Sequence, residues 1–314
     1  MSKCLYCYRE LEDGQVDFHP GCARKFFGSD TAPLLPYTRD NMSELARRII
    51  RSSMSITGVQ AKMSLDVNRG GNHEPKKITI VGLWGKYIFK PQSARYPCLP
   101  ELEDLTMKMA ETAHIRTAKH TLIRLADGEL GYLTLRMDRG QKGEKISLLD
   151  LCQLSNRLTE HKYYGSYPQL AETVKKYSAA PMLDVQRFWE IVLFSWITGN
   201  SDMHCKNFSL IDSGDGEYVL APAYDLLAVQ LADPEDTDEM ALSFMVGGNK
   251  TGFDRDTFFT AFTQSGIAGT TANKMIDRMK SFRPAWEELI CQSFLPNKMK
   301  SDYLALLEDR IRRL

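Results

Sequence analysis

The fold is decided around residues 199–207, which read GNSDMHCKN. The apolar spacing of the preceding segment, Val185 to Thr198, predicts a buried helix that Asp184 could cap. The stretch is therefore expected to be the loop at the end of that helix, from which an Asp and an Asn five residues apart can both point into a cleft. The alternative is a solvated polar loop in which Asp202 and Asn207 only form turns.

The sequence before this loop is rich in predicted strands. KKITIV (76–81) and WGKYIF (84–89) contain β-forming residues, and Gly82 between them predicts a hairpin. A helix is expected from Leu102 to Thr112, and YLTL (132–135) returns to strand. This half of the chain is therefore predicted to form a β-rich lobe that contains one helix.

These patterns divide the chain into three parts. They are a small segment with Cys and His residues (1–50), a β-rich lobe (51–140) and a helical lobe (141–314). A short amphipathic helix is expected near the end of the first part, from Ser43 to Ile50. A β-rich half followed by a helical half predicts an α+β fold of two lobes, in which an enzyme would have its site in the cleft.

Composition is that of an ordinary folded chain. Of 314 residues, 43% are hydrophobic and 25% are charged, which argues against wholesale disorder. The 40 basic and 40 acidic residues cancel, and because non-specific binding to nucleic acid needs excess positive charge, strong binding to DNA by this chain alone is not expected. The sequence shows no apolar run that could span a bilayer and no secretory apolar core at its start. A cytoplasmic protein with seven reduced cysteines is therefore expected.

The loop and the segment after it contain groups that suit phosphoryl transfer. That chemistry needs a lysine near the nucleotide phosphates, oxygen ligands for Mg²⁺ and a carboxylate that accepts the proton of a substrate hydroxyl. Asp202 would be the base, Asn207 an oxygen ligand, and Lys206 could steady the phosphoryl group. Asp225 follows the short predicted strand 218–220 in an apolar setting that suits a ligand for Mg²⁺. It could instead be a turn residue that caps the next helix.

The candidate lysine is Lys90, which ends the predicted strand YIFK (87–90). Its neighbours are apolar, so its ammonium group needs a carboxylate or a phosphate as a partner. Glu103 on the following helix is the candidate positioning carboxylate, and Glu101 is a near rival. The alternative is a surface lysine at the edge of a strand.

A hydroxyl-rich stretch, SSMSITGVQAK (52–62), precedes the first strands. Backbone N–H groups around Gly58 could form a nest for phosphate. The stretch lacks the Walker A pattern and the three glycines of the eukaryotic kinase loop. A plain serine-rich linker is the alternative.

The N-terminal part contains a possible metal site. CLYC (4–7) and HPGC (19–22) supply Cys4, Cys7, His19 and Cys22, four ligands that suit tetrahedral Zn²⁺. Zinc would cross-link a segment that is too short for a core of its own. The alternative is that the reduced cysteines pack in a small hydrophobic cluster. Cys98, Cys152, Cys205 and Cys291 show no such pairing and are expected to be structural.

Taken together, these motifs resemble the HipA family of bacterial toxin kinases. Four motifs carry the resemblance, in the family's order: SITGVQAK (55–62), YIFKP (87–91), GNSDMHCKNFSL (199–210) and APAYDL (221–226). The resemblance runs from about Ser52 to near the C-terminus and implies a two-lobed, protein-kinase-like fold. It also implies an ATP- and Mg²⁺-dependent serine/threonine protein kinase that acts as the toxin of a toxin–antitoxin system.

The resemblance assigns roles to individual residues. It implies that Asp202 is the catalytic base, that Lys90 contacts the nucleotide phosphates, and that Asn207 and Asp225 bind Mg²⁺. Leu135 stands where the family often has Glu in the adenine hinge, so its adenine contact is expected through the backbone. The other residues implied in nucleotide binding are Thr57, Gly58, Val59, Gln60, Ala61, Lys62, Glu103, Arg136, Met137, His204 and Tyr224.

Regulation and partners are implied in the same way. Ser55 matches the serine that this family autophosphorylates, and with Ser53 it resembles the paired site of the shorter HipT-type toxins. Phosphate there should expel the loop from the nucleotide site, although Ser53 could simply end a helix. The implied partners are a protein substrate such as an aminoacyl-tRNA synthetase, a DNA-binding HipB-like antitoxin, and a separate small protein in place of the longer N-terminal subdomain of full-length members. No membrane partner is expected.

Two other functions would use parts of the same motifs. A small-molecule or lipid kinase shares the Mg²⁺ and positioning groups, and a catalytically silent regulator would bind the nucleotide without transfer. Together, Lys90, Asp202, Asn207 and Asp225 weigh against the regulator. Incubation with labelled ATP separates the three, because self-labelling is expected of the protein kinase.

Overall fold

The structure is a computed structural model that describes residues 2–42, 44, 62–68, 77–80, 85–140 and 143–314. The chain forms two compact units. The first consists of Met1–Asp104, Ala118–Arg136 and Gln292–Phe294, and the second of Leu105–Thr117, Met137–Cys291 and Leu295–Leu314.

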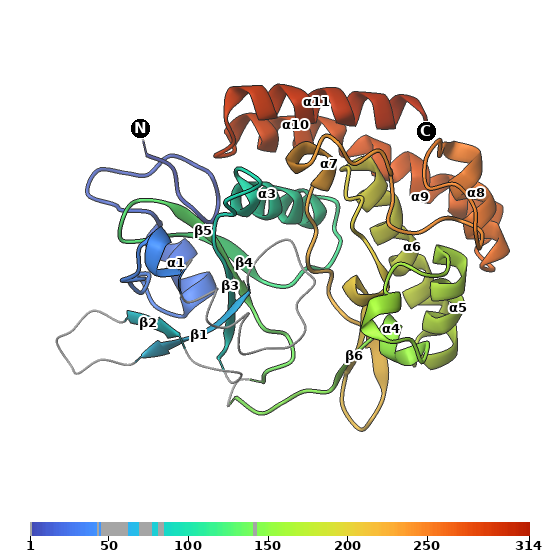
Figure 1. Ribbon diagram of the computed structural model, residues 1–314, viewed down its shortest axis with the longest axis horizontal. Helices are drawn as coiled ribbons and strands as arrows, with labels where there is room; N and C mark the ends of the chain where they lie inside the picture. The colour runs from blue at the N-terminus through green and yellow to red at the C-terminus, as the bar shows by residue number, and fades with distance from the viewer. Residues whose placement is uncertain (1, 43, 45–61, 69–76, 81–84, 141–142) are drawn as a thin grey trace. The chain divides into compact units, whose positions relative to one another are not determined.

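The first unit is built on a five-stranded antiparallel sheet (Figure 1). Its strands lie in the order β2-β1-β3-β5-β4. Because successive residues of a strand point to opposite faces, one face gathers Leu65, Phe89 and Leu133 into a core that Phe26 of α1 joins. The elements are α1 (Pro20–Phe27), β1 (Met63–Asn68), β2 (Lys77–Ile80), β3 (Tyr87–Lys90), β4 (His120–Arg124), β5 (Leu130–Leu135) and α3 (Leu99–Thr112), which begins in this unit and ends in the other.

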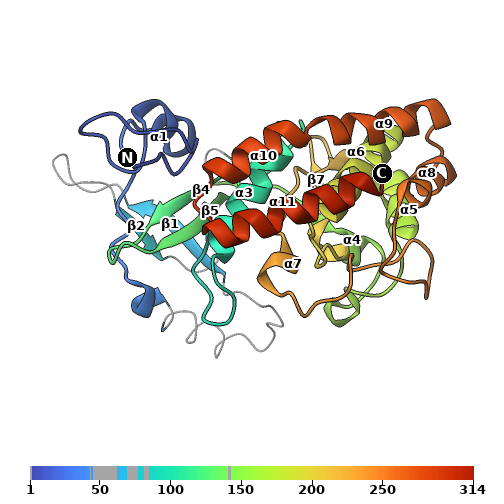
Figure 2. The same ribbon diagram turned by 90° about the horizontal axis from the view of Figure 1, so that it is seen from above.

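The second unit is mainly helical, and Figure 2 shows its long helices α9, α10 and α11. At its centre lies α6, which is apolar on nearly all sides, as a core helix must be, with Trp189 and Trp196 fully buried. A small antiparallel sheet has the order β6-β7-β8. The elements are β6 (Leu148–Asp150), α4 (Leu151–Leu154), η1 (Thr159–His161), α5 (Tyr167–Tyr177), α6 (Pro181–Ile197), η2 (Cys205–Asn207), β7 (Ser209–Asp212), β8 (Tyr218–Leu220), α7 (Val229–Ala232), α8 (Arg255–Gln264), α9 (Gly269–Ser281), α10 (Arg283–Gln292) and α11 (Asn297–Arg312). Among the described helices, none is long and apolar enough to cross a membrane.

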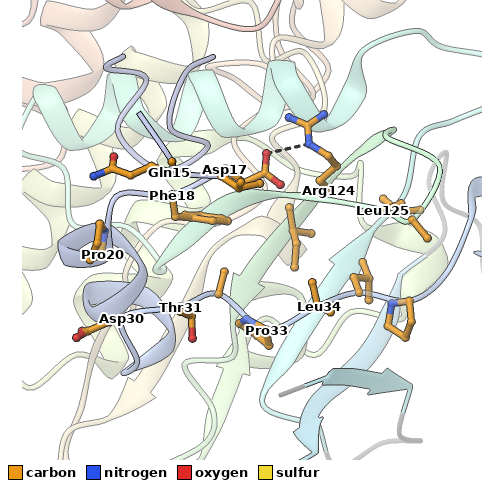
Figure 3. Close-up of a pocket in the computed structure, with 17 residues that line it drawn as sticks. Gln15, Asp17, Phe18, Pro20, Asp30, Thr31, Pro33, Leu34, Arg124 and Leu125 are labelled. Atoms are coloured by element: carbon orange, nitrogen blue, oxygen red, sulfur yellow. Dashed lines mark hydrogen bonds and ion pairs between the residues drawn. The ribbon is translucent and has the colours of Figure 1, made fainter. Parts of the chain in front are cut away.

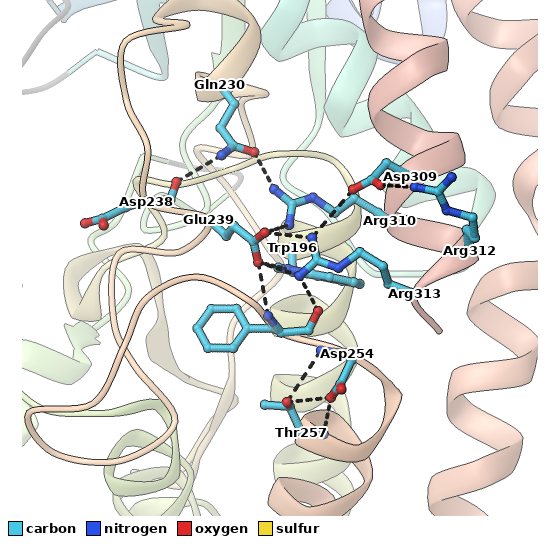
Figure 4. A network of polar contacts seen from close by, with 11 residues as sticks. Trp196, Gln230, Asp238, Glu239, Asp254, Thr257, Asp309, Arg310, Arg312 and Arg313 are labelled. Atoms are coloured by element: carbon cyan, nitrogen blue, oxygen red, sulfur yellow. Dashed lines mark hydrogen bonds and ion pairs between the residues drawn. The ribbon is translucent and has the colours of Figure 1, made fainter.

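A polar network fixes the C-terminal end of this unit (Figure 4). Glu239 accepts hydrogen bonds from Arg313 at 2.7 Å and from the indole of Trp196 at 2.9 Å. It also pairs with Arg310 at 2.6 Å, and only 4% of the Arg310 side chain is exposed. Gln230 accepts a further hydrogen bond from Arg310 at 2.8 Å. The end of α11 is therefore held to α6 through one shared carboxylate.

The strands predicted at 76–81 and 84–89 are present as β2 and β3, but the predicted hairpin is wrong. β1 lies between them, and Leu65 is in register with Ile80 on one side and with Tyr87 on the other. The hairpin prediction rests only on two segments that are neighbours in the sequence. It does not take into account β1, in which apolar and polar residues alternate and which pairs along both of its edges. Gly85 accommodates this arrangement, because a Cβ atom there would lie 2.4 Å from the carbonyl oxygen of Leu65.

The long helix predicted from Val185 is present, but it begins at Pro181, since proline is favoured at the first position of a helix. The predicted cap is therefore wrong. Asp184 lies in the first turn, where its carboxylate accepts hydrogen bonds from Ser178 Oγ at 2.6 Å and Leu220 N at 2.7 Å. The helix predicted for 43–50 lies outside the described residues, apart from Glu44.

Candidate functional site

A buried ion pair lies on the sheet face opposite α1. Lys90, the last residue of β3, donates from Nζ to Glu103 Oε1 at 2.5 Å, and only 6% and 1% of the two side chains are exposed. The ammonium group also lies 5.4 Å from the ring centre of Tyr132. The rival partner, Glu101, instead accepts hydrogen bonds from Gln92. Because a buried ammonium group needs a nearby carboxylate, Glu103 fixes the position of Lys90.

The loop after α6 is set by the way that helix ends. Thr198 Oγ1 donates to the carbonyl oxygen of Phe194 at 2.9 Å, and Gly199 has a φ of +72°. Glycine is the residue that adopts this conformation most easily at a helix end, and a Cβ atom on Gly199 would lie 2.6 Å from Leu306. The N–H group of Asn200 then donates to Ser195. The residues at 198–200 therefore stop the helix and start the loop at a fixed point.

The loop brings Asp202 and Asn207 together. The carbonyl oxygen of Asp202 accepts from the N–H group of His204 at 2.8 Å and from Asn207 Nδ2 at 3.0 Å. Since Asn207 uses its Nδ2 in this contact, its Oδ1 can serve a cation. The Asp202 carboxylate accepts a hydrogen bond from Tyr163 Oη at 2.6 Å. Sequence reasoning missed Tyr163, because the tertiary fold alone brings it to this loop.

Asp225 lies in the same unit, at the end of a segment that Ala223 anchors by donating to Arg116 at 2.7 Å. Its φ of +56° is in the left-handed region, which Asp visits more readily than most residues. Burial lowers the pKa of His204, while the charges of Asp202 and Asp225 act to raise it. The two carboxylates therefore act on one imidazole. The Nδ1 atom of that imidazole is buried, and among the described residues it has no hydrogen-bond partner.

Two further side chains tie this loop to the strands that follow it. Lys206 Nζ donates to Asp150 Oδ2 at 2.7 Å, so a carboxylate already balances its charge. Tyr224 Oη donates to the carbonyl oxygen of Lys206 at 2.8 Å and lies 2.6 Å from Ser209 Oγ. Burial raises the pKa of Tyr224, which keeps its hydroxyl neutral. Tyr224 therefore braces the loop, and Asp150, which no motif indicated, would compete with a phosphate for Lys206.

The predicted adenine hinge continues β5. The N–H group of Leu135 donates to Lys119 at 2.8 Å, and that of Arg136 donates to Lys86 at 2.8 Å. A backbone contact to adenine would therefore have to use a carbonyl oxygen in this stretch or the N–H group of Met137.

Part of the predicted site lies outside the described residues. This part contains both predicted phosphorylation sites and most of the predicted phosphate loop: Ser53, Ser55, Thr57, Gly58, Val59, Gln60 and Ala61. Lys62, which ends the predicted loop, is described and its side chain is exposed.

The four predicted zinc ligands come together in the first unit. The ligand atoms of Cys4, Cys7, His19 and Cys22 all lie within 4.8 Å of one another. Within the described part of the chain, no other cysteine belongs to a cluster of possible metal ligands.

A pocket of about 700 Å³ lies beside the N-terminal segment (Figure 3). Residues 14–18 and 30–36 line it together with the end of β4. Arg124 Nε donates to Asp17 Oδ1 at 2.8 Å at its edge. Its lining contains none of the predicted nucleotide-binding residues, so we do not assign it to ATP.

The sequence of this chain is similar to a known protein family. Residues 54–286 match the HipA-like C-terminal domain. A Haemophilus influenzae protein named "Putative kinase" is 24% identical over 208 residues, covering 63% of this chain and 59% of that protein. A Sinorhizobium fredii protein named "Putative kinase Y4dM" is 28% identical over 293 residues, covering 87% of this chain and 66% of that protein. The chain thus spans less than two thirds of the length of these relatives.

Two solved structures share the fold. HipA of Shewanella oneidensis, solved in a complex with HipB and its operator DNA, gives a TM-score of 0.68 at 19% identity, covering 90% of this chain and 72% of that one. The Helicobacter pylori proinflammatory kinase CtkA gives 0.54 at 14% identity, covering 80% of this chain and 93% of that one. These matches confirm the predicted α+β, kinase-like fold. Because the domain match extends over well over half of the sequence, the chain belongs to the HipA-like family.

Proposed function

We propose that this chain is a kinase that transfers the γ-phosphoryl group of ATP to a serine or threonine of a protein. The buried pair of Lys90 and Glu103 carries the proposal. A strand lysine held by a helix glutamate is the arrangement with which protein kinases engage the nucleotide phosphates. The kinase names of two relatives and the fold shared with CtkA support the same reading.

In this proposal the second unit supplies the transfer chemistry. Asp202 accepts the proton of the attacking hydroxyl. The Lys206 ammonium group exchanges its contact with Asp150 for one with the transferring phosphoryl group, which it stabilises. Asn207 and Asp225 offer the hard oxygen atoms that Mg²⁺ prefers. When bound, the metal neutralises charge on the phosphates. The donor set fits that ion, because the hydrogen bond from Asn207 to Asp202 uses Nδ2 and not the amide oxygen, and Asp225 adds a carboxylate whose charge acts on the same loop at His204.

A test of the metal role is the Mg²⁺ dependence of ATP binding. Asn207→Ala and Asp225→Ala should each raise the Mg²⁺ concentration needed for half-maximal binding in calorimetric titrations. Their effects should not add, since both residues hold ions of one site. Asn207→Asp keeps an oxygen ligand, so the Mg²⁺ concentration that it needs for half-maximal ATP binding should be closer to that of wild type. Asp215→Asn, in the exposed turn between β7 and β8, is the control. Wild-type Mg²⁺ dependence in both alanine variants would remove the two residues from the metal site.

Self-labelling tests the proposed reaction and its regulation together. After incubation with labelled ATP, the chain should carry phosphate on Ser55, with Ser53 as the second candidate position, and its kinase activity should fall. A phosphoserine carries about −1.5 to −2 charge near neutral pH and would repel the triphosphate. A free-energy difference of about 3 kcal/mol is enough to leave the active form near one per cent. Mass spectrometry locates the phosphate.

The outcomes separate the rival functions. Ser55→Ala should keep ATP binding and lose self-inactivation. ATP hydrolysis or small-molecule phosphorylation without any self-labelling would favour a small-molecule kinase. ATP binding without any transfer would favour a silent regulator. Full activity in a Ser55-phosphorylated chain would disprove the switch.

The proposed place of action is the cytoplasm, and the proposed substrate is a translation enzyme such as an aminoacyl-tRNA synthetase. The Shewanella oneidensis relative in fold was solved with HipB and operator DNA. By analogy, one proposed partner of this chain is a HipB-like DNA-binding antitoxin. The other proposed partner, a small N-subdomain-like protein, rests only on the resemblance of the sequence motifs to the HipA family. An Asp202→Asn chain used as a substrate trap should retain the substrate, and a chain with Lys90→Met as well should retain less of it.

A further inference from the structure

The N-terminal Cys/His cluster has the geometry of a closed metal site. Cys7 Sγ lies 3.4 Å and Cys22 Sγ lies 3.8 Å from His19 Nδ1. In a tetrahedral zinc site with bonds of about 2.1 Å to nitrogen and 2.3 Å to sulfur, a nitrogen and a sulfur ligand lie about 3.6 Å apart. The separations found here therefore leave room for one zinc ion between the four ligands.

The orientation of the histidine supports the same assignment independently. His19 Nε2 lies 2.8 Å from the carbonyl oxygen of Glu10. A carbonyl oxygen can only accept, so Nε2 carries the proton, and in the neutral ring Nδ1 presents its lone pair to the thiols. A backbone carbonyl that holds the other ring nitrogen is the usual support of a zinc-bound histidine.

The backbone around the first two cysteines is built as a tight knuckle. The N–H group of Tyr8 donates to Cys4 O at 2.9 Å, and the N–H group of Cys4 donates to Arg9 O at 2.8 Å. Tyr8 has a φ of +65°, in the left-handed region. A non-glycine residue keeps that conformation only where its surroundings impose it. The turn that would hold the metal thus also fixes the direction in which the Tyr8 side chain projects from the backbone.

Tyr8 connects this knuckle to the ion pair described above. Its hydroxyl donates to Asp104 Oδ2 at 2.7 Å, and its ring packs edge-on against Phe294 at 5.2 Å. Asp104 directly follows Glu103 on α3. The other oxygen of Asp104 lies 2.7 Å from His120 Nδ1, and both of these side chains are fully buried.

A second path reaches Lys90 from the same carboxylate. The imidazole of His120 stacks on Tyr132 with ring centres 5.8 Å apart, and that ring lies 5.4 Å from Lys90 Nζ. Asp104 therefore has two roles. It fixes the position of α3, which carries Glu103, and it orients the His120 imidazole, which stacks on Tyr132 beside Lys90. All of these residues belong to the first unit.

We propose that Cys4, Cys7, His19 and Cys22 bind one structural zinc ion, and that the zinc-bound knuckle, acting through Tyr8 and Asp104, positions Glu103 for Lys90. Tyr8 is in this account a positioning residue. The link to activity rests on the proposed kinase function, whereas the metal site does not. Loss of zinc would release the knuckle, deprive buried Asp104 of a donor and loosen the first turns of α3.

Metal content tests the site itself. The purified full chain should contain about one zinc per molecule by elemental analysis. Co²⁺ exchanged into it should give the thiolate charge-transfer bands and the strong visible bands of a tetrahedral site. Cys7→Ser and Cys22→Ser should lose the metal, and Cys291→Ser, which changes an exposed cysteine, should keep it. A wild-type chain that neither contains zinc nor gives these Co²⁺ bands would overturn the site, as would both ligand variants retaining a full equivalent.

The coupling is tested with a variant that leaves the four ligands intact. Tyr8→Phe keeps the ring and removes the hydroxyl, so it should retain its zinc and raise the KM for ATP about threefold to tenfold, with a smaller change in kcat. Tyr37→Phe is the control, because the Tyr37 hydroxyl has no hydrogen-bond partner among the described residues. An unchanged KM in zinc-loaded Tyr8→Phe would overturn the coupling.

Hydrogen exchange keeps the coupling testable if the chain proves not to be a kinase. Removal of zinc with a chelator should speed amide exchange in the first turns of α3, Leu99–Asp104, and leave α9 unchanged. Unchanged exchange in α3 after complete zinc loss would also overturn the coupling. A chain that loses this protection but never transfers phosphate would refute the proposed function alone.

Discussion

The Asp202→Asn protein should bind ATP normally and transfer phosphate about 10² to 10⁴ times more slowly than wild type, the range that a positioned general base contributes. The loss should appear in kcat rather than in KM, since the base acts on the hydroxyl proton during transfer. The asparagine has the same shape, and its Oδ1 can still accept the hydrogen bond that Tyr163 now donates at 2.6 Å. The fold and the loop should therefore survive, and a thermal melt checks this.

Tyr163→Phe separates positioning from proton transfer. Burial, followed by the hydrogen bond to Asp202, raises the pKa of Tyr163, so its phenol stays protonated and acts as a donor. Removing that donor frees one carboxylate oxygen but leaves the base in place. The variant should thus retain far more activity than Asp202→Asn. Asp215→Asn is the matched carboxylate control and should behave as wild type. Normal turnover in a folded Asp202→Asn protein would refute the assignment of the base.

The features that the sequence predicted correctly are local ones. The buried helix α6 and the loop after it were predictable because apolar periodicity and a glycine at the helix end depend on residues that adjoin in the chain. The close approach of the four Cys and His ligands was predictable for the same reason, since both pairs lie within one short segment. Lys90 and Glu103 lie on two consecutive elements, the strand β3 and the helix α3, and their side chains form an ion pair in the structure.

The features that the sequence did not predict depend on distant segments. Tyr163 reaches Asp202, and Asp150 reaches Lys206, only through the packing of the second unit. The position of β1 between β2 and β3 results from competition among several possible strand pairings. A turn signal between two segments does not show which of these pairings is the most stable. Tyr8 belongs to this group as well, because nothing near it in the sequence indicates Asp104 as its partner.

A second large effect of a single side chain is predicted for Glu239, whose network contributes to the stability of the fold. Burial opposes ionisation of Glu239, but hydrogen bonds from Arg313 and Trp196 and the charges of both arginines outweigh it and lower its pKa from 4.5 to about 2. Arg310 depends on this carboxylate, because burial lowers the pKa of its guanidinium group, while the charge and the hydrogen bond of Glu239 act to raise it. Removing one member of such a buried group is costly, because the remaining charges keep their desolvation penalty.

Glu239→Gln should therefore lower the free energy of unfolding by about 3 kcal/mol at neutral pH, the order given both by the pKa shift and by other broken buried ion pairs. The folded-state pKa lies below the unfolded one, so the carboxylate contributes fully above about pH 4.5 and loses its contribution as the pH falls toward 2. Denaturant titrations of both proteins should show the difference narrowing over that range. Asp302→Asn, which weakens the exposed pair that Lys298 and Asp302 form on the same helix, is the control and should cost less than about 1 kcal/mol. A Glu239→Gln protein as stable as this control, or a difference that stays constant down to the lowest pH at which wild type remains folded, would show that apolar packing rather than the shared carboxylate holds α11 to α6.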